Sequence, residues 1–251
     1  MNRLFNLSSI KDNYKSVLMI LLLVTLSSLL INSFIKPSYV ASAIVSPAEE
    51  DSSLGSILGG GIGGSLVGNL LSSDSTSVQI ALATLESRNF LYDFVMDNSL
   101  LPELEVKNTP WDAHKAMLKR VKAEKITGSQ LYLFSLQWEN PEKSAELLNE
   151  MIASLNEYLK IGELTKLDKE IISYEESIKV VKNQKELSML YSLLERAIGR
   201  KVYIESDDEY VFRTIDPAQP PRSPWWPNYL LLSLLILTLW GILSMFYLKI
   251  I

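Results

Sequence analysis

Two long apolar runs near the ends of this 251-residue chain constrain its fold more than any other feature. The first covers residues 17–35 and the second covers residues 229–248, and neither contains a charged side chain. A helix of about 20 apolar residues crosses the roughly 30 Å hydrocarbon core of a bilayer. We therefore expect two transmembrane helices that flank an exported domain at residues 36–228, with cytoplasmic tails at residues 1–16 and 249–251.

The first run could also be a cleaved signal peptide, but its length and the lack of a small-residue cleavage motif at its end favour a retained anchor. The first tail carries three basic residues against one acidic residue, so the positive-inside rule favours a cytoplasmic location for both ends of the chain. Trp225, Trp226 and Tyr229 then fall at the outer edge of the second span, where an aromatic belt is expected.

Composition excludes several kinds of functional site. The chain has no cysteine and a single histidine, His114, which excludes a disulfide framework, a zinc–thiolate site and an iron–sulfur cluster. A formal net charge of −5 provides no basic excess to neutralise nucleic-acid phosphates, so we expect no nucleic-acid partner. No nucleophile can be paired with a base, and the adjacent acids Asp207, Asp208 and Glu209 are more typical of a solvated turn than of a cation site. We expect no catalytic, cofactor-binding or metal-binding residue, and we expect His114 on the surface.

Residues 55–68 hold seven of the eleven glycines. A phosphate-binding loop requires G-x-x-x-x-G-K-[ST] after a strand, and this stretch contains no lysine. A pliable insert that lies on the membrane or on a neighbouring subunit is the better interpretation.

The remainder of the exported domain alternates between strand and helix patterns. Period-two alternation predicts strands at residues 39–46, 131–138 and 210–216. Helical spacing predicts a helix over residues 77–98 and a second helix that begins after the Thr109 cap and ends near Lys122. The fold class expected from this order is α+β, with a small mixed β-sheet.

The second of these helices carries a basic cluster at Lys115, Lys119, Arg120 and Lys122. A solvated helix face is the simpler interpretation. Contact with an anionic sugar or a lipid headgroup is the functional alternative.

A long helical arm is expected at about residues 141–200, after a cap at Asn140. Apolar residues recur there every three or four positions, the pattern slips near Gly162, and polar residues 182–185 interrupt it. We predict an outgoing helix, a turn and a shorter returning helix. One narrow apolar seam cannot form a globular core alone, so the arm should pack as a coiled coil on its own returning helix and on copies of itself. The candidate oligomer seam comprises Leu164, Leu167, Ile171 and Ile178.

A proline-rich segment at residues 217–227 enters the second apolar run. Proline fixes φ and donates no backbone hydrogen bond, so the segment should be stiff and extended. It is either a linker that separates the sheet from the membrane or a rigid coupling between the exported domain and the span.

The order of these elements resembles the polysaccharide co-polymerases, also called Wzz or chain-length determinant proteins, over nearly the whole chain. The resemblance rests on the two flanking spans and on several segments: SYVASAIVSP, LESRNFLYDF, the Trp111-Asp112 helix that leads to Thr127-Gly128, LFSLQWENPEKSAELLNEMIASLNEYL and VFRTIDPAQPPRSPWWP. The proline-rich motif that family members carry falls here on Pro217, Pro220, Pro221 and Pro224. Gly241 lies in the second span, where family members often have a packing glycine.

Family members are multi-pass proteins of the bacterial inner membrane, with most of the chain in the periplasm, and they assemble as ring-shaped homo-oligomers. The resemblance implies a non-catalytic regulator of the chain length of O-antigen, capsule or exopolysaccharide. Its expected partners are a Wzy-type polymerase, the growing lipid-linked glycan and membrane lipid. The alternative is a coupling subunit of a polysaccharide exporter that works with a separate tyrosine kinase and an outer-membrane channel. A sensor receptor is disfavoured because no cytoplasmic output domain is evident.

The sequence departs from the family in two ways. The glycine-rich stretch is longer than in many members, and the arm is shorter than in the enterobacterial O-antigen regulators. The absence of a phosphate loop argues against the branch with a fused tyrosine kinase.

Overall fold

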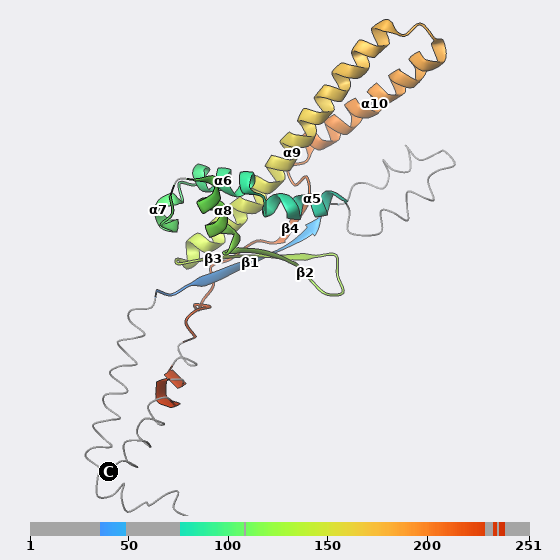
Figure 1. Ribbon diagram of the computed structural model, residues 1–251. Helices are drawn as coiled ribbons and strands as arrows, with labels where there is room; N and C mark the ends of the chain where they lie inside the picture. Colours follow the sequence, from blue (N-terminus) through green and yellow to red (C-terminus); the bar gives the residue numbers. More distant parts are fainter. Residues whose placement is uncertain (1–35, 49–75, 108, 229–232, 235, 239–251) are drawn as a thin grey trace, which may run out of the picture. The chain divides into compact units, whose positions relative to one another are not determined.

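The computed structural model describes residues 36–48, 76–107, 109–228, 233, 234 and 236–238 (Figure 1). The chain divides into two compact units. One comprises Met1–Val40, Trp138–Pro141 and Pro221–Ile251, and the other comprises Ala41–Gln137 and Glu142–Pro220.

The predicted first span, residues 17–35, lies outside the described residues, as do the glycine-rich stretch at 55–68 and Gly241. Of the predicted second span, only residues 233, 234 and 236–238 are described, and they are helical. Within the described ranges, no helix has the length and apolar character needed to cross a bilayer. The two-span topology stays a prediction.

A four-stranded sheet has the order β2-β3-β1-β4. Its strands are β1 (Tyr39–Pro47), β2 (Val121–Lys125), β3 (Tyr132–Trp138) and β4 (Phe212–Asp216). The pairs β2–β3 and β1–β4 are both antiparallel. Together with the long helices described below, this small sheet confirms the predicted α+β class.

Alternation along the two central strands determines which face of the sheet is buried. On β3 the alternate residues Tyr132, Phe134, Leu136 and Trp138 are all buried. On β1 the buried residues are the small Ala41 and Ala43, followed by Val45.

Small residues on β1 leave room for aromatic rings from the strands on either side. The ring of Phe212 on β4 meets Phe134 of β3 edge-on at a centroid distance of 5.1 Å, and Tyr132 at 5.9 Å. These rings converge although β1 separates their strands. The alanines of β1 therefore allow the aromatic core of this sheet to form.

Strand β2 lies where the sequence predicted the end of a helix. Helix α8 (Pro110–Leu118) ends one turn before the predicted end at Lys122, and the Arg120 amide donates to the Met117 carbonyl at 2.8 Å. Val121 then pairs with Leu136 of β3. The charged residues of VKAEK made this segment look like a continuation of the helix. Such charges are typical of an edge strand, because they prevent it from pairing with other chains.

The β2–β3 hairpin turns at Gly128, where φ is +80°. The Ser129 amide donates to the Ile126 carbonyl at 3.1 Å, which closes a four-residue turn. A positive φ at the third residue of such a turn favours glycine.

The single helix predicted over residues 77–98 is instead two helices, α5 (Thr76–Leu85) and α6 (Arg88–Asp97). The break occurs at Ser87, whose hydroxyl accepts a hydrogen bond from the Phe90 amide and caps α6. A short helix α7 (Leu101–Leu104) follows before α8. In Figure 1, α5, α6, α8 and the first half of α9 lie on one side of the sheet.

The predicted arm consists of α9 (Pro141–Val180) and α10 (Gln184–Ser206). Helix α9 is continuous over 40 residues, about 60 Å, through the predicted slip at Gly162. Its buried residues concentrate between Ser144 and Asn156, whereas Leu167 is the single buried residue further along. The first half of α9 therefore belongs to the domain core, and the second half forms a hairpin with α10.

Candidate functional site

Helices α9 and α10 hold each other through a small apolar cluster. Leu167 of α9 is buried with Ala197 and Ile204 of α10. Partly buried residues pack around them, namely Leu164, Ile171, Tyr174, Tyr203 and Tyr210.

This cluster includes most of the predicted oligomer seam. Leu167 is buried with Ala197 and Ile204 of the returning helix, and the partly buried Leu164 and Ile171 pack against that cluster. Ile178 is half-buried. Packing of the arm on its own returning helix was predicted and is found here. Contact of this seam with another copy stays a prediction.

Ion pairs flank the cluster. Arg200 Nη2 lies 3.1 Å from the Glu163 carboxylate, and Lys201 Nζ donates to Asp168 Oδ1 at 2.6 Å. The hydrogen bond to Asp168, opposed by desolvation, raises the pKa of Lys201 above its ordinary value. Arg200 and Lys201 of α10 thus form ion pairs with acids of α9 that lie before and after Leu167 in the sequence. These pairs specify the register of the two helices.

Lys160 closes the base of the hairpin. Its ammonium donates to the backbone carbonyls of Glu205 at 3.3 Å and Asp207 at 2.8 Å, and it lies 3.5 Å from the Asp208 carboxylate. These carbonyls belong to the last turn and the C-cap of α10, where the helix dipole is negative. The Lys160 side chain is only 13% exposed, so α9 supplies a largely buried cation to the end of α10.

Two asparagines on α9 hold the segment that follows α10. Asn156 Oδ1 accepts from the amides of Val211 at 3.1 Å and Phe212 at 2.9 Å, and Nδ2 donates to the Phe212 carbonyl at 2.8 Å. Seven residues earlier, Asn149 Oδ1 accepts from the Ala218 amide at 2.8 Å and Nδ2 donates to the Ala218 carbonyl at 3.0 Å. Each side-chain amide thus accepts from a backbone N–H and donates to a backbone C=O, as the backbone of a neighbouring strand would.

The predicted proline motif begins in this unit. Pro217 and Pro220 are exposed, whereas Ala218 between them is buried. No helix or strand is assigned over residues 217–220. Asn149 therefore fixes the start of the proline-rich segment to the helix that continues into the arm.

In the other unit, Ser38 binds the end of the same segment. The Ser38 carbonyl accepts from the amides of Trp225 at 2.8 Å and Trp226 at 3.2 Å, and its amide donates to the Trp226 carbonyl at 2.8 Å. Pro221 and Pro224 are half-buried. The residues that follow the first predicted span are thus paired with those that precede the second.

The residues weighed for catalysis or metal binding are engaged in other contacts. Asp207 Oδ1 accepts from the Glu209 amide at 2.9 Å, and Glu209 Oε1 accepts from the Thr214 amide at 3.0 Å. Across the ranges that the structure describes, no group of three His, Asp or Glu side chains is arranged to hold a metal ion. His114 is half-buried, and its Nε2 lies 2.9 Å from the Glu86 carbonyl oxygen.

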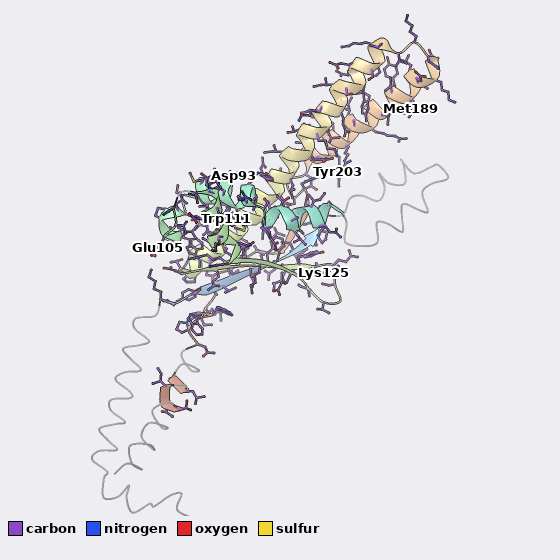
Figure 2. All side chains as sticks on the ribbon, in the orientation of Figure 1. Asp93, Glu105, Trp111, Lys125, Met189 and Tyr203 are labelled. Atoms are coloured by element: carbon purple, nitrogen blue, oxygen red, sulfur yellow. The ribbon has the colours of Figure 1, made fainter. Side chains whose placement is uncertain are left out.

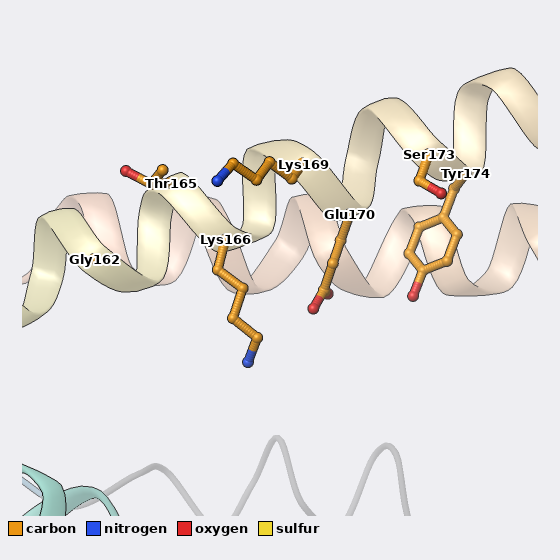
Figure 3. A pocket seen from close by; sticks show the side chains of 7 residues that line it. All are labelled: Gly162, Thr165, Lys166, Lys169, Glu170, Ser173 and Tyr174. Atoms are coloured by element: carbon orange, nitrogen blue, oxygen red, sulfur yellow. The ribbon is translucent and has the colours of Figure 1, made fainter.

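A shallow open depression runs along one face of α9 (Figure 3). Its lining consists of Gly162, Thr165, Lys166, Lys169, Glu170, Ser173 and Tyr174. These side chains carry both signs of charge, and Lys166 also lies 3.8 Å from Glu163. The depression presents no arrangement of groups that selects one ligand.

Sequence reasoning missed Asn149, Asn156 and Lys160. A signal for Asn156 was present, because this residue follows Leu155 in a stretch whose apolar residues recur at helical spacing. A polar residue inside an apolar stripe requires a partner, although the sequence does not say which one. Lys160 gave no comparable signal.

No family model matches the sequence, and no curated protein matches it. The chain is similar to the solved structure of a full-length bacterial polysaccharide co-polymerase, with 12% identity over 99% of this chain and 96% of that chain and a TM-score of 0.44. It is also similar to a fragment of WzzB, a polysaccharide co-polymerase from Salmonella Typhimurium, with 14% identity over 76% of this chain and all of that chain and a TM-score of 0.38.

Proposed function

We propose that this chain is a non-catalytic regulator of surface polysaccharide chain length, anchored by two spans in a bacterial inner membrane with its domain in the periplasm. It works as a homo-oligomer beside a Wzy-type polymerase that extends a lipid-linked glycan. The motifs quoted from the sequence support the polysaccharide assignment. The observation that carries the architecture is the pairing of Ser38 with Trp225 and Trp226, because a domain that stands on two spans needs its entry and exit side by side.

The exposed apolar residues of the arm are the basis for the proposed homo-oligomer. With Leu167 engaged inside the chain, other apolar residues of the arm remain exposed. On α9 these are Ile161, Ile172 and Val180, and on α10 they are Met189, Tyr191, Ile198 and Val202. Ile161 and Ile172 are eleven residues apart, about three helical turns, and therefore share one face of α9. We place the contact between copies on these faces.

Surface-glycan analysis tests the function. A strain that lacks the gene should make surface polysaccharide with an altered length distribution on a silver-stained gel, and the intact gene should restore it. An unchanged distribution contradicts the proposal. Loss of the polymer, rather than a change of its length, supports the alternative role as a coupling subunit of an exporter.

Topology is testable because the chain has no cysteine. Ser42 and Glu157 are exposed residues of the domain, so Ser42→Cys and Glu157→Cys should react with a membrane-impermeant maleimide from the periplasmic side. Ser8→Cys, in the predicted cytoplasmic tail, is the matched control and should react only after the inner membrane is opened. The reverse pattern contradicts the proposed topology.

Oligomerisation has its own test. Ile172→Asp and Val202→Asp add a charge to the exposed faces of the arm and should lower the mass of the detergent-extracted protein toward that of a single chain. Lys166→Asp adds an acid to the same hairpin at a polar, exposed position and should leave the mass unchanged. A wild-type protein that is strictly monomeric after extraction overturns this part of the proposal.

A further inference from the structure

Trp111 is an exposed tryptophan on a firmly held helix. It lies in the first turn of α8 (Figure 2). Its side chain is 61% exposed. Thr109 caps this turn by accepting from the Asp112 amide, while Ala113 and Met117 on the opposite face are fully buried. Since the helix is fixed from both sides, Trp111 cannot turn inward without breaking the cap or the packing. A ligand that covered this indole would gain about 25 cal/mol per Å² of apolar surface removed from water.

Two further groups surround the indole. The Arg88 guanidinium carbon, from the first residue of α6, lies 5.4 Å from the centre of the Trp111 ring. The His114 ring centre lies 6.4 Å from the same ring. Within the part of the chain that is described, no carboxylate is within salt-bridge distance of Arg88.

The hydrogen bond of His114 defines what its ring offers to a ligand. A carbonyl oxygen can only accept, so the proton of the bond to Glu86 lies on His114 Nε2. In the neutral ring, Nδ1 is then an acceptor for a hydroxyl group. The three side chains together present an aromatic face, a planar cation and a hydroxyl acceptor.

These groups match an acidic sugar. The C–H face of a pyranose packs on an aromatic ring, a guanidinium binds a carboxylate with two parallel hydrogen bonds, and an acceptor binds a ring hydroxyl. A protein partner fits less well, because a stable protein interface buries about 800 Å² on each side. The other exposed large apolar residue of α8 is Leu118, two turns away, and the exposed Lys115 lies between it and Trp111.

We propose that Arg88, Trp111 and His114 form a binding site for an acidic sugar residue of a polysaccharide. The proposal rests on the proposed function for the identity of the polymer, and it adds the residues and the chemical class of sugar.

Binding of a defined oligosaccharide to the full chain in detergent tests the site. The probes are a hexasaccharide of hyaluronan, which contains glucuronate, and maltohexaose, a neutral oligosaccharide of equal length. Saturation-transfer NMR and calorimetry should show binding of the acidic probe and much weaker binding of the neutral one. Trp111→Ala and Arg88→Gln should each weaken acidic-probe binding about tenfold, equivalent to about 1.4 kcal/mol.

Matched controls separate the site from general effects. Trp225→Ala removes another exposed tryptophan, and Arg196→Gln removes another exposed arginine. Both should bind as wild type, and the circular dichroism of all four variants should be unchanged.

Three results overturn the site: equal binding of both probes, wild-type binding by Trp111→Ala and Arg88→Gln, or no binding by the wild-type chain. Loss of polymerase co-purification in these variants, without any binding of sugar, overturns it in favour of a protein surface. The glycan-length test of the gene deletion is independent. If the deletion alters the length distribution but the chain binds no acidic probe, the site fails and the proposed function stands. If the probe binds and the deletion has no effect, the function fails.

Discussion

Asn156 on α9 is hydrogen-bonded to both backbone groups of Phe212 on β4, with its Oδ1 2.9 Å from the amide nitrogen and its Nδ2 2.8 Å from the carbonyl oxygen. Phe212 is fully buried and Asn156 is 3% exposed, so no water replaces these bonds. The arm helix therefore holds the edge strand β4 through a single side chain. Asn149 repeats the contact at Ala218, two residues beyond the end of β4.

Asn156→Leu should strongly destabilise the domain. Leucine has a similar branched shape but is larger and has no hydrogen-bonding group, so it leaves three buried backbone groups without partners, namely the amides of Val211 and Phe212 and the Phe212 carbonyl. We expect a loss of about 2–4 kcal/mol in the free energy of unfolding, measured by urea denaturation of the full chain in detergent. Glu157→Leu changes the exposed neighbouring residue and should cost less than about 0.5 kcal/mol. Equal effects of the two substitutions contradict the role assigned to Asn156.

Ala43→Leu should disrupt the sheet core. Ala43 is 1% exposed on the central strand β1, over which Phe134 and Phe212 meet at 5.1 Å. A larger side chain forces the rings apart, and overpacking of this kind costs about 1–3 kcal/mol. Ser42→Leu, on the exposed face of the same strand, is the matched control. Thermal unfolding that is lowered in Ala43→Leu but not in Ser42→Leu is the expected result, and the opposite order would refute this account of the core.

Lys160→Met should loosen the end of α10. Methionine keeps most of the apolar stem but removes the ammonium that donates to the carbonyls of Glu205 and Asp207. We expect a loss of about 1–2 kcal/mol and faster amide exchange at Tyr203–Asp207, measured by hydrogen–deuterium exchange. Lys166→Met, which removes a largely exposed lysine from the same helix, should leave that exchange unchanged. Protection of the last turn in Lys160→Met at the wild-type level would show that the lysine does not cap the helix.

The elements that sequence predicted correctly are those whose apolar pattern is strong and local. Strand β3 alternates over its full length, and the proline after Asn140 indicated the start of α9 at Pro141. Strand β2 was missed because its charged residues face solvent at the edge of the sheet and continue the polar pattern of α8. The break at Ser87 was missed because the apolar spacing continues across it.

The parts of the candidate site that could not be predicted depend on contacts between residues far apart in the sequence. The spacing of Leu164, Leu167 and Ile171 shows that they share a face but not whether that face meets α10 or another copy. The sequence of α9 also does not show that its first half packs in the domain core while its second half does not. Neither property is encoded in the helix itself, because both depend on where α10 returns.

Leu167→Ala distinguishes a contact inside the chain from a contact between copies. Leu167 is 2% exposed against Ala197 and Ile204, so its truncation leaves a cavity within the hairpin. We expect a loss of about 2–4 kcal/mol in the stability of the arm, detected as increased amide exchange in α10. Ile172→Ala removes a similar side chain that is 55% exposed and should leave α10 protected. If Leu167 served contacts between copies, Leu167→Ala would instead lower the oligomeric mass while α10 kept its protection, and the arm would have to be reassigned as a seam between chains.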